Sequence, residues 1–584
     1  MQLRSFAAWV MVAPLLAVPT VTEAQTVSNP STAPDCMNNT AFFNTNLPPS
    51  INLPPGFTAS VFASGLNMPT GIAFLGNATN FQVYVLESGH GLPSVCNDEM
   101  AWPGGPFDIK NPFTPDILVF NRNGKLIRGP LGKPTSAGGG FQPSGPAIDV
   151  AFVNGLSGGT LFATDSNQST HQHNGQNNSS RIITVNPMTG VVNPFITNLP
   201  TGDHPTEQLA FGGDGWIYWS QGSTTNSGVV GLDNGGGQNQ SDIPCQDITL
   251  SQNVFSSGNG QLTSGYSPFN TQNPGGTIPA FFNSFTGQVR QGVCDGAILR
   301  AQLSNPSNIQ AFSWGYRNPY AIRFPPKGHP LDGGILAGMD GADERGNRPS
   351  NNAPEEIHLG RQNPDGSPDY HGWPDRYGGL PTSQAVFNPI GGPSDDLCPA
   401  PFDQAACVAA LTAAGDIPIR DVLAGPPQQI TGPLANEGAD SSFTGIDFVP
   451  DVFVGGPVQP GAALYALEGD FGFSPPNSSN PEAEIGHEVK LINFNQLPGS
   501  PLALRIQNFA RNSTNDQAFI TNINGFNRPT NIRFGPDGCA YVVDYGAVRD
   551  NGPDTHFVGA ANGPLVQIPG TGVIWKITRE DSRD

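Results

Sequence analysis

Short apolar segments that end in Phe recur along the chain, and each is followed by a turn and a second apolar segment. In the clearest copy, Leu209–Phe211 precedes the turn at 212–215, which reads Gly-Gly-Asp-Gly, and Trp216–Trp219 follows it. Gly and Asp-Gly supply the positive φ angles that tight hairpin turns require, and an alternating apolar and aromatic run is typical of a strand. This pattern predicts a β-hairpin.

The same hairpin pattern occurs six times in order along the chain. Its copies are Gly71–Phe74 with Val83–Val85, Asp149–Phe152 with Thr160–Phe162, Gln208–Phe211 with Trp216–Tyr218, Ala321–Phe324 with Gly334–Leu336, Gly445–Phe448 with Ala463–Tyr465, and Asn531–Phe534 with Ala540–Val542. A single hairpin cannot bury its own apolar face, and radial repetition of such units forms a closed propeller. We therefore predict an all-β fold, a six-bladed β-propeller over residues 51–580.

The intervals between the hairpins indicate long inserted loops. Several intervals exceed the roughly 40 to 50 residues of a plain blade, and the tracts 228–292 and 378–433 are rich in Gly, Asn, Gln, Ser and Pro. The chain has 73 Gly, 58 Pro and only 12% charged residues, a composition that disfavours helical bundles. One short helix is predicted in the Ala-rich run Phe402–Ala414.

The N-terminal segment predicts export. Residues 1–24 combine Arg4, a largely apolar run and small residues before Gln25, as in a cleaved secretory signal, with an uncleaved anchor as the alternative. Residues 25–50 form an N-terminal extension. No later stretch reaches the roughly 18 apolar residues of a membrane span. We expect a secreted or periplasmic protein without a membrane span.

Net charge narrows the class of partner. The chain carries 26 Lys and Arg against 47 Asp and Glu, a net charge of −21. Such a charge repels nucleic acid and anionic membranes, so we expect no nucleic-acid partner. A neutral or cationic small molecule is compatible with it, although an acidic surface also simply keeps an exported protein in solution.

Seven cysteines in an exported chain predict up to three disulfides and one free thiol. We expect Cys398 to pair with Cys407 across a loop. Cys539, inside the sixth hairpin, is expected to be the free cysteine and to be buried as a small apolar residue. The remaining connectivity cannot be deduced from one sequence.

Three short motifs follow one another in a fixed order. Asp203-His204 precedes the third hairpin, Trp314–Pro319 precedes the fourth, and Glu355–Leu359 is followed by Tyr370–Pro374. This order resembles the glucose/sorbosone dehydrogenase family, the soluble quinoprotein sugar dehydrogenases that use pyrroloquinoline quinone (PQQ) and calcium on a six-bladed propeller. The opening Phe57–Leu66 and the closing Asn527-Arg528-Pro529 also resemble that family's first and last blades.

The resemblance assigns roles to four residues. His204 is the expected general base, which takes a proton from the sugar hydroxyl while hydride passes to the quinone and electrons then go to an external acceptor. Neutral imidazole suits that task near pH 7, and the cofactor supplies the electron sink. Arg317, Asn318 and Arg528 are the expected PQQ-binding residues, because guanidinium groups pair with carboxylates. A rim histidine satisfied by loop hydrogen bonds is the alternative for His204.

Calcium is the second component that the resemblance implies. The expected metal ligands are the backbone carbonyls of Gly341 and Ala342. The neighbouring side chains that offer the hard oxygens Ca²⁺ favours are Asp340, Asp343, Glu344, Glu355 and Glu356. A solvated acidic loop is the alternative.

Two positions depart from the family's pattern. Thr530 stands where the best-studied branch has a second arginine, and the lysine of the fifth blade is missing from a segment that carries Glu468 and Asp470. Fewer cations opposite a tricarboxylate should weaken PQQ binding unless a residue such as Lys490 compensates.

Three functions are therefore compared. The first is an exported PQQ-dependent dehydrogenase that oxidises a sugar or a related aldehyde. The second is a non-catalytic propeller that binds carbohydrate or protein and has lost the cofactor, because fold alone does not imply function. The third is a calcium-dependent lactonase-type hydrolase, which needs carboxylate and amide ligands converging on one metal; no such set is evident in the sequence.

Overall fold

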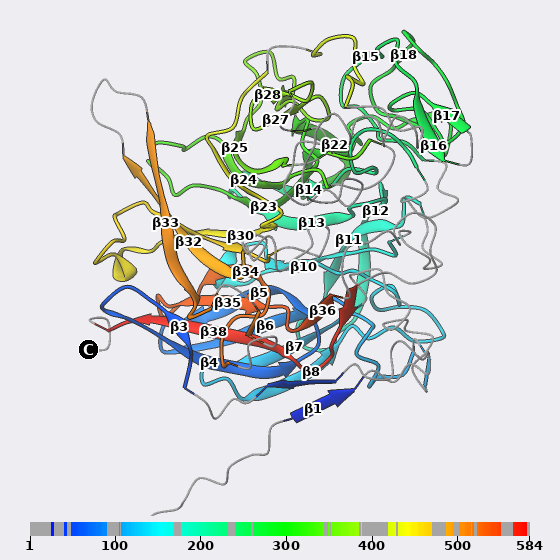
Figure 1. Cartoon of the computed structure of the whole chain (residues 1–584). Coiled ribbons are helices and arrows are strands. Elements are labelled where there is room, and N and C mark those ends of the chain that lie inside the picture. Colours follow the sequence, from blue (N-terminus) through cyan, green and yellow to red (C-terminus); the bar gives the residue numbers. More distant parts are fainter. Residues whose placement is uncertain are drawn as a thin grey trace, which may run out of the picture.

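The computed structural model describes residues 25–28, 40–43, 48–89, 104–105, 107–168, 177–231, 240–258, 261–343, 348–350, 352–384, 387, 419–427, 430–469, 486–495, 502–514, 517–518, 523–550 and 565–580. These residues form an almost entirely β structure (Figure 1). The predicted signal at 1–24 and the predicted helix at 402–414 lie outside the described residues.

Six sheets of four or five strands form the six blades of a β-propeller, as predicted. Blade 1 consists of β5 (Pro69–Asn77), β6 (Asn80–Glu87), β7 (Asp116–Asn121) and β8 (Leu126–Leu131). Blade 2 consists of β9 (Val150–Phe152), β10 (Leu161–Asp165), β11 (Ser180–Val185) and β12 (Val192–Leu199). Blade 3 consists of β13 (Thr206–Ala210), β14 (Trp216–Gln221), β21 (Ala297–Gln302), β22 (Asn305–Trp314) and β26 (Asp369–Tyr370). Blade 4 consists of β23 (Asn318–Arg323), β24 (Ile335–Asp340), β25 (Pro354–Gly360) and β29 (Ala435–Ala439). Blade 5 consists of β30 (Phe443–Phe448), β31 (Ala463–Leu467), β32 (Glu488–Asn495), β33 (Ala503–Asn512) and β3 (Ile51–Asn52). Blade 6 consists of β34 (Pro529–Phe534), β35 (Ala540–Asp544), β38 (Gly572–Arg579) and β4 (Phe57–Leu66).

All six predicted hairpins are the first two strands of a blade. Their registers place Phe74 opposite Val83 in blade 1 and Ala210 opposite Tyr218 in blade 3. The first strands of neighbouring blades pack against one another around the axis. The hairpin pattern is therefore confirmed as the repeating unit of the propeller.

The blades are extended by small hairpins in inserted segments. These are β15 (Ile248–Thr249) with β18 (Thr277–Ile278), β16 (Phe255–Gly258) with β17 (Gln261–Thr263), β19 (Phe282–Asn283) with β20 (Gln288–Val289), β27 (Arg376–Tyr377) with β28 (Leu380–Pro381), β36 (Val548–Asp550) with β37 (Leu565–Gln567), and β1 (Gln25–Ser28) with β2 (Thr40–Phe43). Two 3-10 turns lie at Gly155–Ser157 and Asp451–Phe453. Figure 1 shows β15 to β18, β27 and β28 gathered at one end of the molecule, at the top of the view.

The N-terminal strand β4 closes the ring. It pairs with the C-terminal strand β38 along its whole length, from Phe57 opposite Arg579 to Leu66 opposite Gly572. Figure 1 shows this blue strand beside the red one. Phe57–Leu66, which resembles a family first blade in sequence, thus completes the last blade, so both chain ends hold the circle together.

A polar network along the axis ties the blades to one another. Arg533 of blade 6, which is 4% exposed, donates from Nη1 to the Ile446 carbonyl of blade 5 at 2.9 Å and from Nη2 to Gln208 Oε1 of blade 3 at 3.0 Å. The Asp149 carboxylate of blade 2 lies 3.7 Å from the same guanidinium. Gln208 Nε2 in turn donates to the Thr444 carbonyl at 2.8 Å. One guanidinium therefore connects four blades.

The cysteines and the surface add two further findings. Cys245 and Cys294 form a disulfide, and Cys539 is a buried free thiol as predicted. Cys36, Cys96 and the proposed Cys398–Cys407 pair lie outside the described residues.

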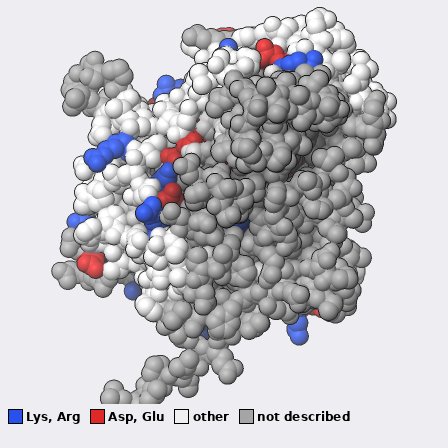
Figure 2. All heavy atoms as spheres, viewed as in Figure 1, with Lys and Arg blue, Asp and Glu red and all other residues white. Residues whose placement is uncertain are grey.

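Charged side chains that are visible and described on the face in Figure 2 are scattered, with both signs interspersed. Among the described residues, no helix has the length and apolar character needed to cross a bilayer.

Arg533→Met tests the axial network. The substitution leaves the buried Asp149 carboxylate without its guanidinium, and loss of one partner of a buried ion pair costs about 3–5 kcal/mol of unfolding free energy. Urea unfolding should show this loss. The matched control is Arg323→Met, whose pair with Asp447 is 34% exposed at the arginine and should cost less than about 1 kcal/mol. Equal losses in both variants would contradict the network's importance.

Candidate functional site

The predicted site residues lie at one end of the propeller, where first strands begin and second strands end. Asn318 at the start of β23 is opposite Asp340 at the end of β24. Phe443 is likewise opposite Leu467 in blade 5, and Pro529 is opposite Asp544 in blade 6. The segments just before β13, β23, β30 and β34 therefore share one rim.

His204 is held on this rim by backbone hydrogen bonds to the segment that follows β14. Its N–H donates to the Ser223 carbonyl at 3.0 Å, and the Asp203 N–H donates to the Thr224 carbonyl at 2.9 Å. Gly222 is required by close approach, because a Cβ atom there would lie 2.2 Å from the Cβ of His204. These backbone contacts thus fix the position of the His204 Cβ atom, which carries the imidazole ring.

Two carboxylates flank the His204 ring. Nε2 lies 3.4 Å from Oδ2 of Asp203, and Nδ1 lies 3.7 Å from Oε1 of Glu207. The histidine side chain is 20% exposed, whereas both carboxylates are buried. Both ring nitrogens therefore face buried carboxyl groups.

Arg317 joins the loop that carries Asp203 and His204, here called the base loop, to the predicted calcium loop at Gly341 and Ala342. Its buried guanidinium donates from Nη1 to the Gly341 carbonyl at 2.5 Å and from Nη2 to Asp343 Oδ2 at 2.6 Å. The same Nη2 lies 3.3 Å from Asp203 Oδ2. Arg317 is consequently in contact with the base loop on one side and with residues 341–343 on the other.

Asn318 bridges two buried carboxyl groups. Its Nδ2 donates to Asp340 Oδ2 at 2.9 Å, and its side chain also hydrogen bonds to Glu207. All three side chains are buried. The structure thus brings His204, Arg317 and Asn318 together, as the order of the motifs predicts.

The predicted metal-binding loop is ordered by Glu355. The Gly341 N–H donates to Oε2 of Glu355 at 2.9 Å, while its carbonyl accepts the bond from Arg317. Ala342 is buried in the core. In the described part of the chain, no three or more His, Cys, Asp or Glu side chains are arranged to hold a metal ion. The two backbone carbonyls stay a prediction.

The acidic side chains of Glu355 and Glu356 point to opposite faces of the strand that follows this loop. Glu355 faces the rim, where its second oxygen also accepts the Ser442 N–H at 3.2 Å. Glu356 faces away and contacts the Gly378 N–H at 2.8 Å and the His358 ring at 3.0 Å, because successive strand residues point to opposite faces. Glu344 lies outside the described residues.

Arg528 lies on the same rim, in blade 6. It is fully buried, donates from Nη1 to the Gly469 carbonyl at 3.2 Å, and its backbone N–H donates to Asp544 at 2.8 Å. The segment beside it is linked to the loop at Gly341 through Ser442, because the Glu468 N–H donates to the Ser442 carbonyl at 2.9 Å and the Ser442 N–H donates to Glu355. Arg528 therefore belongs to the far side of the same site.

The two departures from the family pattern have structural consequences. Thr530 Oγ1 donates to the Pro69 carbonyl at 3.1 Å and so helps to join blade 6 to blade 1. Lys490 is bonded to Glu437 and lies 3.8 Å from Glu488. Its charge is thus already shared between one carboxylate of blade 4, Glu437, and one of blade 5, Glu488. Asp470 lies outside the described residues.

Burial changes the protonation of the rim carboxyl groups. It raises the pKa of Glu207, Asp340 and Glu355 well above the usual range, and neighbouring carboxylates raise each of them further. It raises the pKa of Glu468 to about 8, although the charge of Arg528 opposes that rise. The rim therefore carries less negative charge at neutral pH than its composition suggests.

The residues fit PQQ and calcium under one condition. Arg317 and Arg528 have the charge to pair with an anionic quinone but would have to exchange their present partners, Asp343 and the carbonyls of Gly341 and Gly469, to do so. Backbone and carboxyl oxygens are the ligand type that Ca²⁺ favours. An anion is compatible with this rim while the buried carboxyl groups stay protonated. As pH rises through about 8, the ionised Glu468 should repel it.

Comparisons with known proteins give a structural likeness alone. No family model matches the sequence, and no curated protein matches it. The PQQ domain of a pyranose dehydrogenase from Coprinopsis cinerea is similar at 14% identity and TM-score 0.44, over 91% of this chain and 97% of that one. A Trichoderma reesei enzyme of carbohydrate-active family AA12 is similar at 14% identity and TM-score 0.43, over 91% and 97%. The soluble aldose sugar dehydrogenase of Escherichia coli is similar at 12% identity and TM-score 0.44, over 90% and 99%. Because all three TM-scores are below 0.5, the function proposed below rests on the site residues.

Sequence reasoning missed Glu207 and Gly222. Glu207 follows His204 by three residues, and only its burial beside the imidazole distinguishes it from other acidic residues. Gly222 ends the predicted hairpin, where a glycine has no special signal. Both depend on how the loop before β13 folds back onto the loop after β14.

Glu468→Gln tests the electrostatics of the rim. The folded protein keeps the Glu468 proton up to a pH of about 8, whereas the unfolded value is 4.5. The contribution of protonated Glu468 to the unfolding free energy is therefore fully present below pH 4.5, and it is lost as the pH rises to about 8. The glutamine variant should match the wild type near pH 4 and exceed its unfolding free energy at pH 9 by on the order of 5 kcal/mol.

Denaturant unfolding across this pH range measures the difference. The control is Glu580→Gln, at an exposed position, which should leave the stability unchanged at every pH. A pH-independent offset for Glu468→Gln would contradict the assigned pKa.

Proposed function

We propose that this protein is an exported quinoprotein dehydrogenase that oxidises a sugar or a related aldehyde with PQQ and calcium. One observation carries the proposal. The base loop and the Arg317 motif, whose residues Asp203 and Arg317 are 114 positions apart, meet at 3.3 Å on one rim. This proximity of two motifs that resemble parts of a quinoprotein site supports the proposal.

Each side chain has a role in this reaction. PQQ, when bound, accepts the hydride. His204 takes the proton from the substrate hydroxyl, since it is the partly exposed group of the pair, and the buried Asp203 and Glu207 carboxyl groups hold the ring in place. Imidazole held between such partners is oriented before substrate arrives, which is how an orienting carboxylate assists a histidine base.

The cofactor-binding role falls to the cations and the loop. Arg317, Asn318 and Arg528 would hold the quinone, the two guanidinium groups pairing with its carboxylates. The Gly341 and Ala342 carbonyls, with the hard oxygens around them, would hold calcium. An external acceptor would receive the electrons. A neutral sugar suits a chain whose net charge is −21, because no anionic group of the substrate is repelled.

A second candidate is a non-catalytic propeller that binds carbohydrate or protein. It is favoured by Thr530, which lacks a charge and bonds to blade 1, and by Lys490, which is paired with Glu437 of blade 4. A lactonase-type hydrolase has no observation in its favour, because the described residues show no group of three or more His, Cys, Asp or Glu side chains arranged around one metal position.

His204→Asn tests the proposed base. With PQQ and calcium supplied, the wild type should reduce a dye in the presence of at least one aldose, and the variant should lose about 10²- to 10⁴-fold in kcat. Quinone affinity should change little, because His204 does not bind the cofactor's carboxylates. The control is Arg317→Met, which should weaken quinone binding first. Full activity in His204→Asn would rule out the base, and a wild type that binds no PQQ would favour the second candidate.

A further inference from the structure

Two buried carboxyl groups lie directly behind the base loop and have no role in the reaction described so far. Asp295 is 3% exposed and precedes β21, and Asp242 is 1% exposed in the segment inserted after β14. Both belong to blade 3, the blade that carries His204. Their carboxylates accept hydrogen bonds from Thr224 and Thr225, which lie in the segment that follows β14 and pairs with the base loop.

Asp295 anchors the loop through three hydrogen bonds. Its Oδ2 accepts the Thr224 N–H at 3.2 Å and the Thr224 hydroxyl at 2.5 Å, and its Oδ1 accepts the Ile243 N–H at 2.8 Å. Thr224 itself is fully buried, and its carbonyl accepts the Asp203 N–H. A single carboxylate thus fixes the residue against which the base loop is paired.

Asp242 repeats the arrangement one residue later. Its Oδ1 accepts the Thr225 N–H at 2.9 Å and its Oδ2 accepts the Thr225 hydroxyl at 2.5 Å. Burial raises its pKa to about 7, and the charge of Asp203 contributes to that rise. Asp242 is therefore electrostatically coupled to the residue next to the base.

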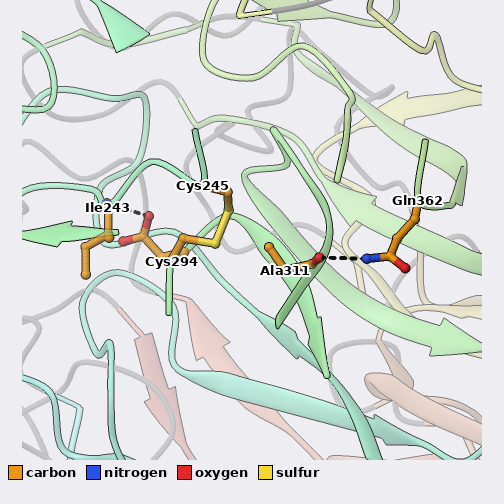
Figure 3. The surroundings of a disulfide bond; sticks show 6 residues. Ile243, Cys245, Cys294, Ala311 and Gln362 are labelled. Carbon is orange, nitrogen blue, oxygen red and sulfur yellow. Dashed lines mark hydrogen bonds between the residues drawn. A yellow bond between two sulfur atoms is a disulfide. The ribbon is translucent and has the colours of Figure 1, made fainter. Parts of the chain in front are cut away.

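A disulfide holds the anchor in place. Cys245–Cys294 cross-links the segment after Ile243 to the residue before Asp295, and the Asp295 N–H also donates to the Ile243 carbonyl at 3.1 Å. Figure 3 shows the disulfide beside the hydrogen bond made by Ile243. The inserted segment is thus fastened to the blade at the point where it supports the loop.

We propose that Asp295, braced by the Cys245–Cys294 disulfide, is a positioning residue for His204. The inference rests on the proposed role of His204 as the base. Asp295 does not touch the substrate or the cofactor; it fixes Thr224, which fixes Asp203 and the His204 backbone. A displacement of about 1 Å at a reacting group can cost on the order of 10²-fold in rate, so this anchor matters for turnover.

Asp295→Asn is the direct test. Both carboxylate oxygens accept a backbone N–H, so an asparagine must place its NH₂ group against the N–H of Thr224 or of Ile243. The variant should lose about tenfold to a hundredfold in kcat with little change in KM. The matched control is Asp165→Asn, in blade 2, whose buried carboxylate also accepts a backbone N–H, from Gln142, and which should leave kcat unchanged.

A second readout does not depend on turnover. The His204 ring resonances are identified by their loss in His204→Asn and are followed against pH by NMR in the resting protein. The His204 titration curve should be displaced in Asp295→Asn and unchanged in Asp165→Asn. If Asp295→Asn does not fold, Thr224→Val, which removes only the hydroxyl donor, replaces it and should displace the curve in the same direction.

The outcomes separate the two proposals. An unchanged titration curve in a folded Asp295→Asn or Thr224→Val variant overturns the positioning role, whatever the activity. A displaced curve in a protein that shows no quinone-dependent activity supports the positioning of His204 and counts against the dehydrogenase.

Discussion

The pairing of β4 with β38 is the constraint on which the rest of the structure depends. It joins residues near the two ends of the described chain and closes six blades into a circle. In a closed circle the first strands all begin at one end of the axis, so loops far apart in sequence meet on a common rim. The contact between Asp203 and Arg317 joins neighbouring blades 3 and 4 on that rim, and blade 6 brings Arg528 to the same rim.

Burial determines the chemistry of this rim more than net charge does. Carboxyl groups outnumber guanidinium groups there, yet low solvent exposure keeps several of them protonated to higher pH than usual. The same burial makes every ionic contact stronger than it would be in water. Protonation of these groups lowers the repulsion that the rim would exert on an anion. The acidity of the chain and an anionic quinone are compatible for this reason.

The sequence allowed the blades to be predicted because each hairpin carries its own local signal, an apolar strand ending near Phe and a Gly-containing turn. It also placed His204, Arg317 and Asn318 in one site through the order of their motifs. Glu207 and Asp295 could not be found in that way, because their importance comes from burial against loops that fold back from elsewhere. The Cys245–Cys294 bond has no local signal either, since cysteine connectivity depends on the path of the inserted segment.

The most direct test of the account is a calorimetric titration of the metal-stripped protein with PQQ in the presence of calcium, at pH 6.5 and at pH 9, two values chosen roughly on either side of the Glu468 pKa of about 8. Saturable binding is expected, weaker at the higher pH and weaker again in Arg317→Met. An absence of binding at both pH values, with the protein folded, would contradict the central claim that this rim is a quinone site.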